Sequence, residues 1–402
     1  MAQIPGSVSV QTETRNSDDD QSKLIWSYAS LRFMKPIVQN ALIVIAATTL
    51  SLVVLEGAAK LYSGRSIEGS FWIYSSDKTV KFDPIAGFRL TTDVTLEARI
   101  SNGVAEYVGS LHGNNKGFPS RAFLPTRTDR RIRRYAVFGD SFSQGEFYVR
   151  NWPDYAENLT MDDVQPIQFL NFSLNATGLA NWWSIIINEV SNYDLDGVIF
   201  ADFGNDLDRP FTMMHMADKK FRIGRLPFWD PTLYPKTFDA AEPYLPDGER
   251  YFRYYIFDEP NFLRALSGEW HPDEWFVQRQ YRAVESRLHS FPAPTRPSGD
   301  DERWRQLMMA DIAKWIATRK LDARVIYIPS RDELLARQSN SNYKLDAQRF
   351  SQVIGASFYD GSNLYVGMND DAIRAHFFPY DAHWNLAGAD LFATYVVGIL
   401  RK

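Results

Sequence analysis

The sequence has no cysteine, no excess of basic residues and only one long hydrophobic run without charge. The absence of cysteine excludes disulfides, thiolate metal sites, iron–sulfur clusters and cysteine nucleophiles. The formal net charge of -5 argues against a nucleic-acid partner, because proteins that bind nucleic acid usually carry a basic face. What is present is a chain of 402 residues with 45% hydrophobic content, enough to bury one large core or two smaller ones.

The one long uncharged run is "PIVQNALIVIAATTLSLVVL", residues 36–55. At 1.5 Å per residue a helix of this length spans roughly 30 Å, the thickness of a bilayer core. Apolar residues occupy every face of that helix, which favours a membrane span over a buried core helix. The small residues of "EGAA" that follow also leave a cleaved signal peptide open.

An uncleaved signal anchor over 36–57 is the interpretation we favour. A cleaved signal peptide would have an unusually long and acidic leading region, containing Asp18, Asp19 and Asp20. The basic residues before the run predict a cytosolic N-terminus and a periplasmic or extracellular body. We therefore expect a single-pass, membrane-anchored protein with a disordered cytosolic tail over residues 1–35.

The rest of the chain changes character near residue 134. Residues 58–133 contain short alternating runs and predict a β-rich preamble, in which the basic run at 127–134 is interpreted as a solvated edge. From 134 to 402 apolar strands alternate with helical stretches, which is typical of a parallel α/β sheet. The predicted strands are 135–139, 167–173, 197–203 and 323–330, and the predicted helices are 147–160, 179–192, 302–319 and 386–400.

Residues 207–300 interrupt this alternation with an insertion that is rich in aromatic residues and proline. We expect irregular structure there. Two compatible interpretations remain open: the aromatic rings form a small core of the insertion, or they offer apolar faces to a sugar or acyl chain.

Ser141 follows the predicted strand 135–139 in "YAVFGDSFSQGE". A serine nucleophile needs a base, a group that orients the base, and donors for the oxyanion. Of the six histidines, His383 in "PYDAHWNLAG" is the best candidate for the base, because Asp381 precedes it and a helix follows. The side-chain amide of Asn205, after the third strand, can donate to an oxyanion, as can the N–H groups of the turn after the second strand, including those of Ala176 and Gly178.

GDSFSQG, NFSLNATG, FGND and DAHWNLAG, in this order, resemble the four motifs of the SGNH (GDSL-type) hydrolase superfamily. The narrower resemblance is to its exported, membrane-anchored bacterial branch. It covers residues 134–206 and 375–400 well, the preamble loosely, and the insertion not at all. The motif is not the G-x-S-x-G elbow of α/β-hydrolases, so the expected fold is a three-layer flavodoxin-like sandwich.

The resemblance implies a role for each matched residue. Ser141 matches the nucleophile, whose own N–H is one oxyanion donor, and Asn205 matches the asparagine that supplies another. His383 matches the general base, with Asp381 in the orienting position. Two departures are visible: the glycine of the second motif falls on Ala176, with Gly178 two residues later, and the carboxylate is two residues before the histidine, where three is more frequent.

These residues predict acyl transfer through a covalent intermediate, without a cofactor. We expect an esterase that acts on O-acyl, chiefly O-acetyl, groups of envelope or exported carbohydrate, or on a small ester. A polysaccharide O-acetyltransferase with the same site is the alternative, and a non-catalytic glycan-binding component of a polysaccharide-export system is a third hypothesis. A metal site at Asp381 and His383 is disfavoured because the sequence offers no third ligand at suitable spacing.

Overall fold

The computed structural model describes residues 38–51, 53–54, 70–74, 79–101, 104–122, 124–145, 150–217, 220–226, 251–253, 299–338, 341–381 and 383–401. The chain divides into two compact units, Met1–Arg65 with Pro272–Tyr281, and Ser66–His271 with Arg282–Lys402. In the first unit the described residues are helical over 38–51 and at 53 and 54.

None of the helices in these ranges has both the length and the hydropathy that crossing a membrane requires. The membrane span predicted over 36–57 is therefore not found in the part of the chain that the structure describes. Its positions 36, 37, 52 and 55–57, and the tail predicted over 1–35, lie outside that part.

The second unit is built on a five-stranded sheet in which every neighbouring pair is parallel. The order across the sheet is β13-β12-β8-β6-β7, so the strands follow the flavodoxin-like order, in which the first strand lies between the second and the third. This confirms the predicted parallel α/β fold. The strands are β6 (Arg133–Phe138), β7 (Ile167–Asn171), β8 (Gly197–Phe203), β12 (Asp322–Ile328) and β13 (Ser357–Asp360).

Alternate residues of the central strands enter two separate hydrophobic cores. On β6, Ala136 and Phe138 pack into one core, while Tyr135 and Val137 pack into the other. Both faces of the sheet are thus buried, which explains why these strands read as continuous apolar runs. The result is a sandwich of three layers, helix, sheet and helix.

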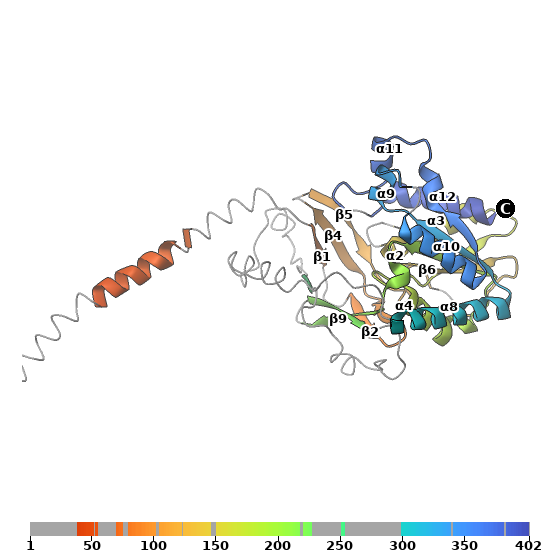
Figure 1. Ribbon diagram of the computed structural model, residues 1–402, viewed down its shortest axis with the longest axis horizontal. Helices are drawn as coiled ribbons and strands as arrows, with labels where there is room; N and C mark the ends of the chain where they lie inside the picture. The colour runs from red at the N-terminus through yellow and green to blue at the C-terminus, as the bar shows by residue number, and fades with distance from the viewer. Residues whose placement is uncertain are drawn as a thin grey trace, which may run out of the picture. The chain divides into compact units, whose positions relative to one another are not determined.

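Helices cover both faces of the sheet (Figure 1). Trp182, Met308 and Phe350 place α4, α8 and α10 in the first core, and Trp152 and Phe392 place α3 and α12 in the second. The helices are α2 (Ser141–Gln144), α3 (Trp152–Thr160), α4 (Leu179–Asn188), α8 (Gly299–Arg319), α9 (Arg331–Leu335), α10 (Asn342–Ile354), α11 (Asp370–Arg374) and α12 (Leu386–Leu400), with 3-10 turns η1 (Val190–Asn192), η2 (Asp206–Asp208) and η4 (Gly361–Tyr365).

The preamble contains two small antiparallel sheets. A polar and an aromatic contact join it to the sandwich: the Arg89 guanidinium donates to Glu189 at 2.7 Å, and the Phe118 ring packs edge-on against Phe172, the residue after β7. The strands are β1 (Ser70–Tyr74), β4 (Thr95–Ser101) and β5 (Val104–Leu111) in one sheet, and β2 (Val80–Asp83) and β3 (Gly87–Leu90) in the other.

The start of the predicted insertion is regular, which corrects the expectation of irregular structure for this part. An antiparallel sheet is formed by β9 (Phe211–Ala217), β10 (Lys220–Leu226) and β11 (Tyr251–Arg253). Phe211 and Met213 are fully buried in the first core of the sandwich, so the pairing of β9 is supported by packing against the main body. Residues 227–250 and 254–298 lie outside the described part, so the proposed aromatic lid is not tested.

Candidate active site

The strand order reverses between β6 and β8, and the first and third motifs follow these two strands. The carboxyl ends of strands beside such a reversal are where open parallel sheets bind ligands. The fold therefore places Ser141 and Asn205, which the sequence singled out, at the expected edge of the sheet.

Ser141 begins the single-turn helix α2 directly after β6. Asp140 caps this helix, since its Oδ1 accepts a hydrogen bond from the Phe142 N–H at 3.0 Å. Ser141 is 5% exposed, so the capped turn fixes its hydroxyl within a mostly enclosed site.

His383 reaches Ser141 from the opposite end of the chain. The Nε2 of His383 lies 2.7 Å from the Oγ of Ser141. The imidazole stacks on the Phe142 ring with 4.7 Å between centroids, and 23% of its side chain is exposed. One face of the base is therefore held by packing, while the edge that carries Nε2 meets the hydroxyl.

Asp381 binds His383 twice through the same oxygen. Its Oδ1 contacts the ring Nδ1 and also accepts the His383 main-chain N–H at 2.6 Å. The carboxylate folds back onto the residue two positions later, so the short Asp–x–His spacing suffices to bring it to the ring. A proton on Nδ1 satisfies the carboxylate and leaves Nε2 as the acceptor for the Ser141 hydroxyl.

The loop that carries this pair is held from two sides. The Arg331 guanidinium, at the start of α9, donates to the carbonyl oxygens of Phe378 and Asp381 at 2.7 and 3.0 Å. From the preamble, Glu106 of β5 accepts the Tyr380 N–H at 2.8 Å. The preamble therefore contacts the segment that positions the base.

Ala176 adopts a backbone φ of 57°, in the left-handed region that favours glycine. The resemblance places the glycine of the second motif at this position, so the turn keeps its conformation although the residue differs. The neighbouring residues tie this turn to the first motif: the Asn175 N–H donates to Gln144 at 2.7 Å, and the Thr177 hydroxyl donates to the Gly139 carbonyl at 3.2 Å.

Gly178 has a steric reason to be glycine. A Cβ atom at this position would lie 2.1 Å from the carbonyl oxygen of Asp206. The loop of the second motif therefore packs directly on the turn of the third motif. This packing is separate from the N–H donation predicted for Gly178.

Asn205 is the exposed residue that precedes the 3-10 turn η2. Its Oδ1 accepts a hydrogen bond from the Nε of Arg209 at 3.3 Å. Because the oxygen of the amide faces Arg209, Nδ2 is the group of Asn205 that is oriented elsewhere and can donate.

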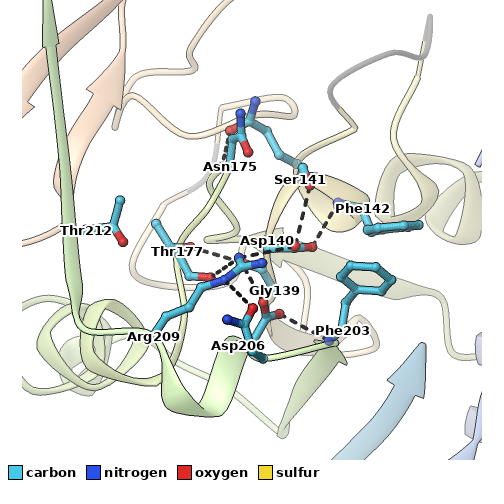
Figure 2. A network of polar contacts seen from close by, with 12 residues as sticks. Gly139, Asp140, Ser141, Phe142, Asn175, Thr177, Phe203, Asp206, Arg209 and Thr212 are labelled. Carbon is cyan, nitrogen blue, oxygen red and sulfur yellow. Dashed lines mark hydrogen bonds and ion pairs between the residues drawn. The ribbon is translucent and has the colours of Figure 1, made fainter. Parts of the chain in front are cut away.

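Some of the predicted site residues contact one another directly, and others are linked only through intervening residues. Ser141, His383 and Asp381 are hydrogen-bonded directly. The predicted oxyanion residue Ala176 is linked to the serine turn through its neighbour Asn175, whose N–H donates to Gln144. Asn205 is linked to it through Arg209, which pairs with Asp140 (Figure 2).

That network contains residues that sequence reasoning did not find. Asp140, Asp202 and Asp206 are buried close together, with the guanidinium of Arg209 among them. Burial raises the pKa of Asp202 and of Asp206 well above the ordinary value, and the charge of Asp140 adds to the rise in both. Asp202, Asp206 and Arg209 come from the end of β8 and the turn after it, whereas Asp140 follows β6, so only the fold brings the whole cluster together.

In the ranges that the structure describes, no group of three or more histidine or acidic side chains is arranged to hold a metal ion.

No protein-family model and no curated protein matches the sequence, whereas solved structures do. A lipase/acylhydrolase from Enterococcus faecalis matches with 10% identity and a TM-score of 0.35, over 67% of this chain and 95% of that chain. A psychrotrophic esterase from Pseudoalteromonas sp. matches with 8% identity and a TM-score of 0.32, over 67% and 100%. A GDSL-like lipase from Bacteroides thetaiotaomicron matches with 9% identity and a TM-score of 0.32, over 67% and 88%. At identities of 8–10% and TM-scores of 0.32–0.35, these solved hydrolases are distant likenesses of the chain.

Proposed function

We propose that this chain is a serine ester hydrolase in which Ser141 is the nucleophile, His383 the general base and Asp381 its orienting carboxylate. The observation that carries the proposal is the 2.7 Å contact between Ser141 Oγ and His383 Nε2, with Asp381 on the other ring nitrogen. A serine hydroxyl alone is a weak nucleophile at neutral pH, and this arrangement supplies the activation it needs.

In the first step His383 Nε2 takes the hydroxyl proton as Ser141 Oγ attacks the carbonyl carbon of an ester. The negative charge that develops on the carbonyl oxygen is stabilised by the N–H groups of Ser141 and of the Ala176–Gly178 turn and by the Asn205 amide. His383 then gives the proton to the leaving alcohol, and an acyl-serine remains. Water, activated by the same histidine, releases the acid and restores the hydroxyl.

As substrate we propose O-acyl, chiefly O-acetyl, groups on envelope or exported carbohydrate. The support is in the sequence: an uncharged run of twenty residues that suits an exported, anchored body, and an aromatic-rich insertion that suits binding of sugar rings. A sugar hydroxyl in place of water would make the same acyl-serine an O-acetyltransferase intermediate. A partner in polysaccharide export fits either chemistry.

The test uses the full chain and its Ser141→Ala variant. Each protein is incubated with an O-acetylated oligosaccharide, and separately with 4-nitrophenyl acetate plus an unacetylated acceptor oligosaccharide. Release of acetate by the wild type alone supports the hydrolase, and a wild-type-dependent mass gain of the acceptor supports the transferase. Equal behaviour of the two proteins in both assays would contradict catalysis and favour a glycan-binding role.

A further inference from the structure

One side chain, that of Arg209, contacts all three motifs that surround the proposed oxyanion position (Figure 2). Its Nη1 lies 3.4 Å from Asp140 Oδ2 in the first motif and donates to the Thr177 carbonyl at 3.0 Å in the second. Its Nε donates to Asn205 Oδ1 in the third motif. In the chain, Asp140 directly precedes Ser141, and Thr177 directly follows Ala176.

These contacts depend on the shape of the guanidinium. Nε and Nη1 donate in different directions from one rigid plane, so one side chain can bind an amide oxygen and a main-chain carbonyl at once. A lysine ammonium on a flexible stem keeps the charge but lacks this fixed fork. The geometry therefore links the orientation of the Asn205 amide to the position of the Thr177 carbonyl.

The charge of Arg209 is also held in place. Its side chain is 14% exposed, and Nη1 lies 2.8 Å from Asp206 Oδ1. Burial by itself would lower the pKa of Arg209, but the charges of Asp206 and Asp140 outweigh this and raise it. The guanidinium therefore stays positive beside Asp140 and Asp206.

We propose that Arg209 is a positioning residue of the oxyanion hole, which sets the Asn205 amide in register with Ser141. The inference rests on the proposed serine mechanism. Arg209 acts through Asn205 Oδ1: by binding that oxygen it directs Nδ2 to the position of the oxyanion. Its contribution therefore depends on the presence of the Asn205 amide, which a purely structural role would not require.

The test is a double-mutant cycle of Arg209→Lys and Asn205→Ala in the full chain. The readouts are kcat and KM with 4-nitrophenyl acetate, and the rate at which a fluorophosphonate labels Ser141, followed by mass spectrometry. Arg305→Lys is the matched control, because Arg305 pairs with Asp208 on the same turn at 2.6 Å and, within the described ranges, forms its other ion pair with Glu302, outside the first two motifs. Circular dichroism checks that each variant is folded, and Arg209→Gln serves as a second variant if Arg209→Lys is not.

We expect Arg209→Lys to lower kcat and the labelling rate by about 10- to 100-fold with KM nearly unchanged, a loss within the range for disturbed transition-state donors. In the Asn205→Ala background the same change should cost less than about threefold, and Arg305→Lys should be near wild type. Equal losses in both backgrounds, or no loss, would overturn the role of Arg209 and leave the proposed function standing. A wild type whose Ser141 neither turns over the ester nor accepts the label would overturn the proposed function, and this inference with it.

Discussion

Ser141 and His383 are separated by 242 positions in the sequence, yet Ser141 Oγ and His383 Nε2 lie 2.7 Å apart. The fold produces this contact by placing the turn after β6 next to the loop that precedes α12. The Phe142 ring, one residue after the serine, stacks on the imidazole and adds an apolar contact to the hydrogen bond. The serine turn thus supplies both the nucleophile and an aromatic ring against which the general base packs.

Replacement of His383 by alanine removes the acceptor of the serine proton. We expect kcat for an acetyl ester to fall by roughly 10²- to 10⁴-fold, the usual contribution of a general base. His376→Gln is the control, since His376 bonds the Ala372 carbonyl through Nδ1 in the same region of the chain. Similar kinetics for the His383→Ala variant and the wild type would remove His383 from the mechanism.

Asp381→Asn tests the orientation of the base. The amide oxygen can still accept from the His383 main-chain N–H and from Nδ1, but the variant lacks the negative charge that stabilises the imidazolium formed when His383 takes the Ser141 proton. We expect kcat to fall by up to about 10⁴-fold, the loss that the same exchange causes in the serine-protease triad. Asp370→Asn, at an exposed ion pair with Arg337, should leave the rate unaltered. A small effect at Asp381, equal to that at Asp370, would show that another group orients the imidazole.

Ala176→Gly addresses the departure from the glycine of the second motif. Alanine in the left-handed region costs about 1 kcal/mol, which offsets the roughly 0.5–1 kcal/mol that glycine loses in conformational entropy on folding. The free energy of unfolding should therefore remain nearly unchanged. The matched change Ala310→Gly, at an exposed position inside α8, should lose about 1 kcal/mol. Chemical denaturation measures both, and equal losses would mean that the strain at Ala176 is negligible.

Glu97 predicts a pH dependence of stability. It is 2% exposed on β4, and burial raises its pKa from 4.5 to about 8, although the Tyr107 hydroxyl opposes the rise. The folded state therefore binds this proton more tightly than the unfolded chain does. Its stabilising effect is complete below about pH 4.5 and is lost as the pH rises towards about 8.

Glu97→Gln keeps the shape of the neutral carboxyl and removes the titration. Between about pH 5 and about pH 8 the thermal midpoint of the wild type should fall relative to that of the variant. Midpoints that stay parallel over this range would show that Glu97 does not titrate there. Because other titrating groups are shared by both proteins, the difference between them isolates Glu97.

The central sheet is predictable from sequence because buried parallel strands are continuous apolar runs. β8 begins and ends where the run 197–203 predicts, and α12 matches 386–400. The edge strand β13 and helix α10 are not in the prediction. β13 has four residues and no fully buried one, and α10 carries charged residues among its apolar ones, so neither gives a strong periodic signal.

The candidate site also contains residues that the sequence predicts and residues that it does not. Ser141, His383 and Asp381 are found from motif order and chemistry, because the motifs select one serine and one aspartate, and only six histidines compete for the role of base. Arg209 and Asp202 are not found, since their roles depend on contacts between strand endings that only the fold brings together.

The most direct test of the serine mechanism is hydrolysis of 4-nitrophenyl acetate by the wild type, Ser141→Ala and Ser143→Ala. Ser143 lies in the same motif, but its Oγ accepts the indole N–H of Trp152 and is fully buried, so its loss should lower stability and leave hydrolysis measurable. The mechanism predicts that Ser141→Ala, unlike Ser143→Ala, loses hydrolysis by several orders of magnitude and keeps only the residual rate that the oxyanion donors and substrate binding supply. Hydrolysis by Ser141→Ala at the wild-type rate would contradict it.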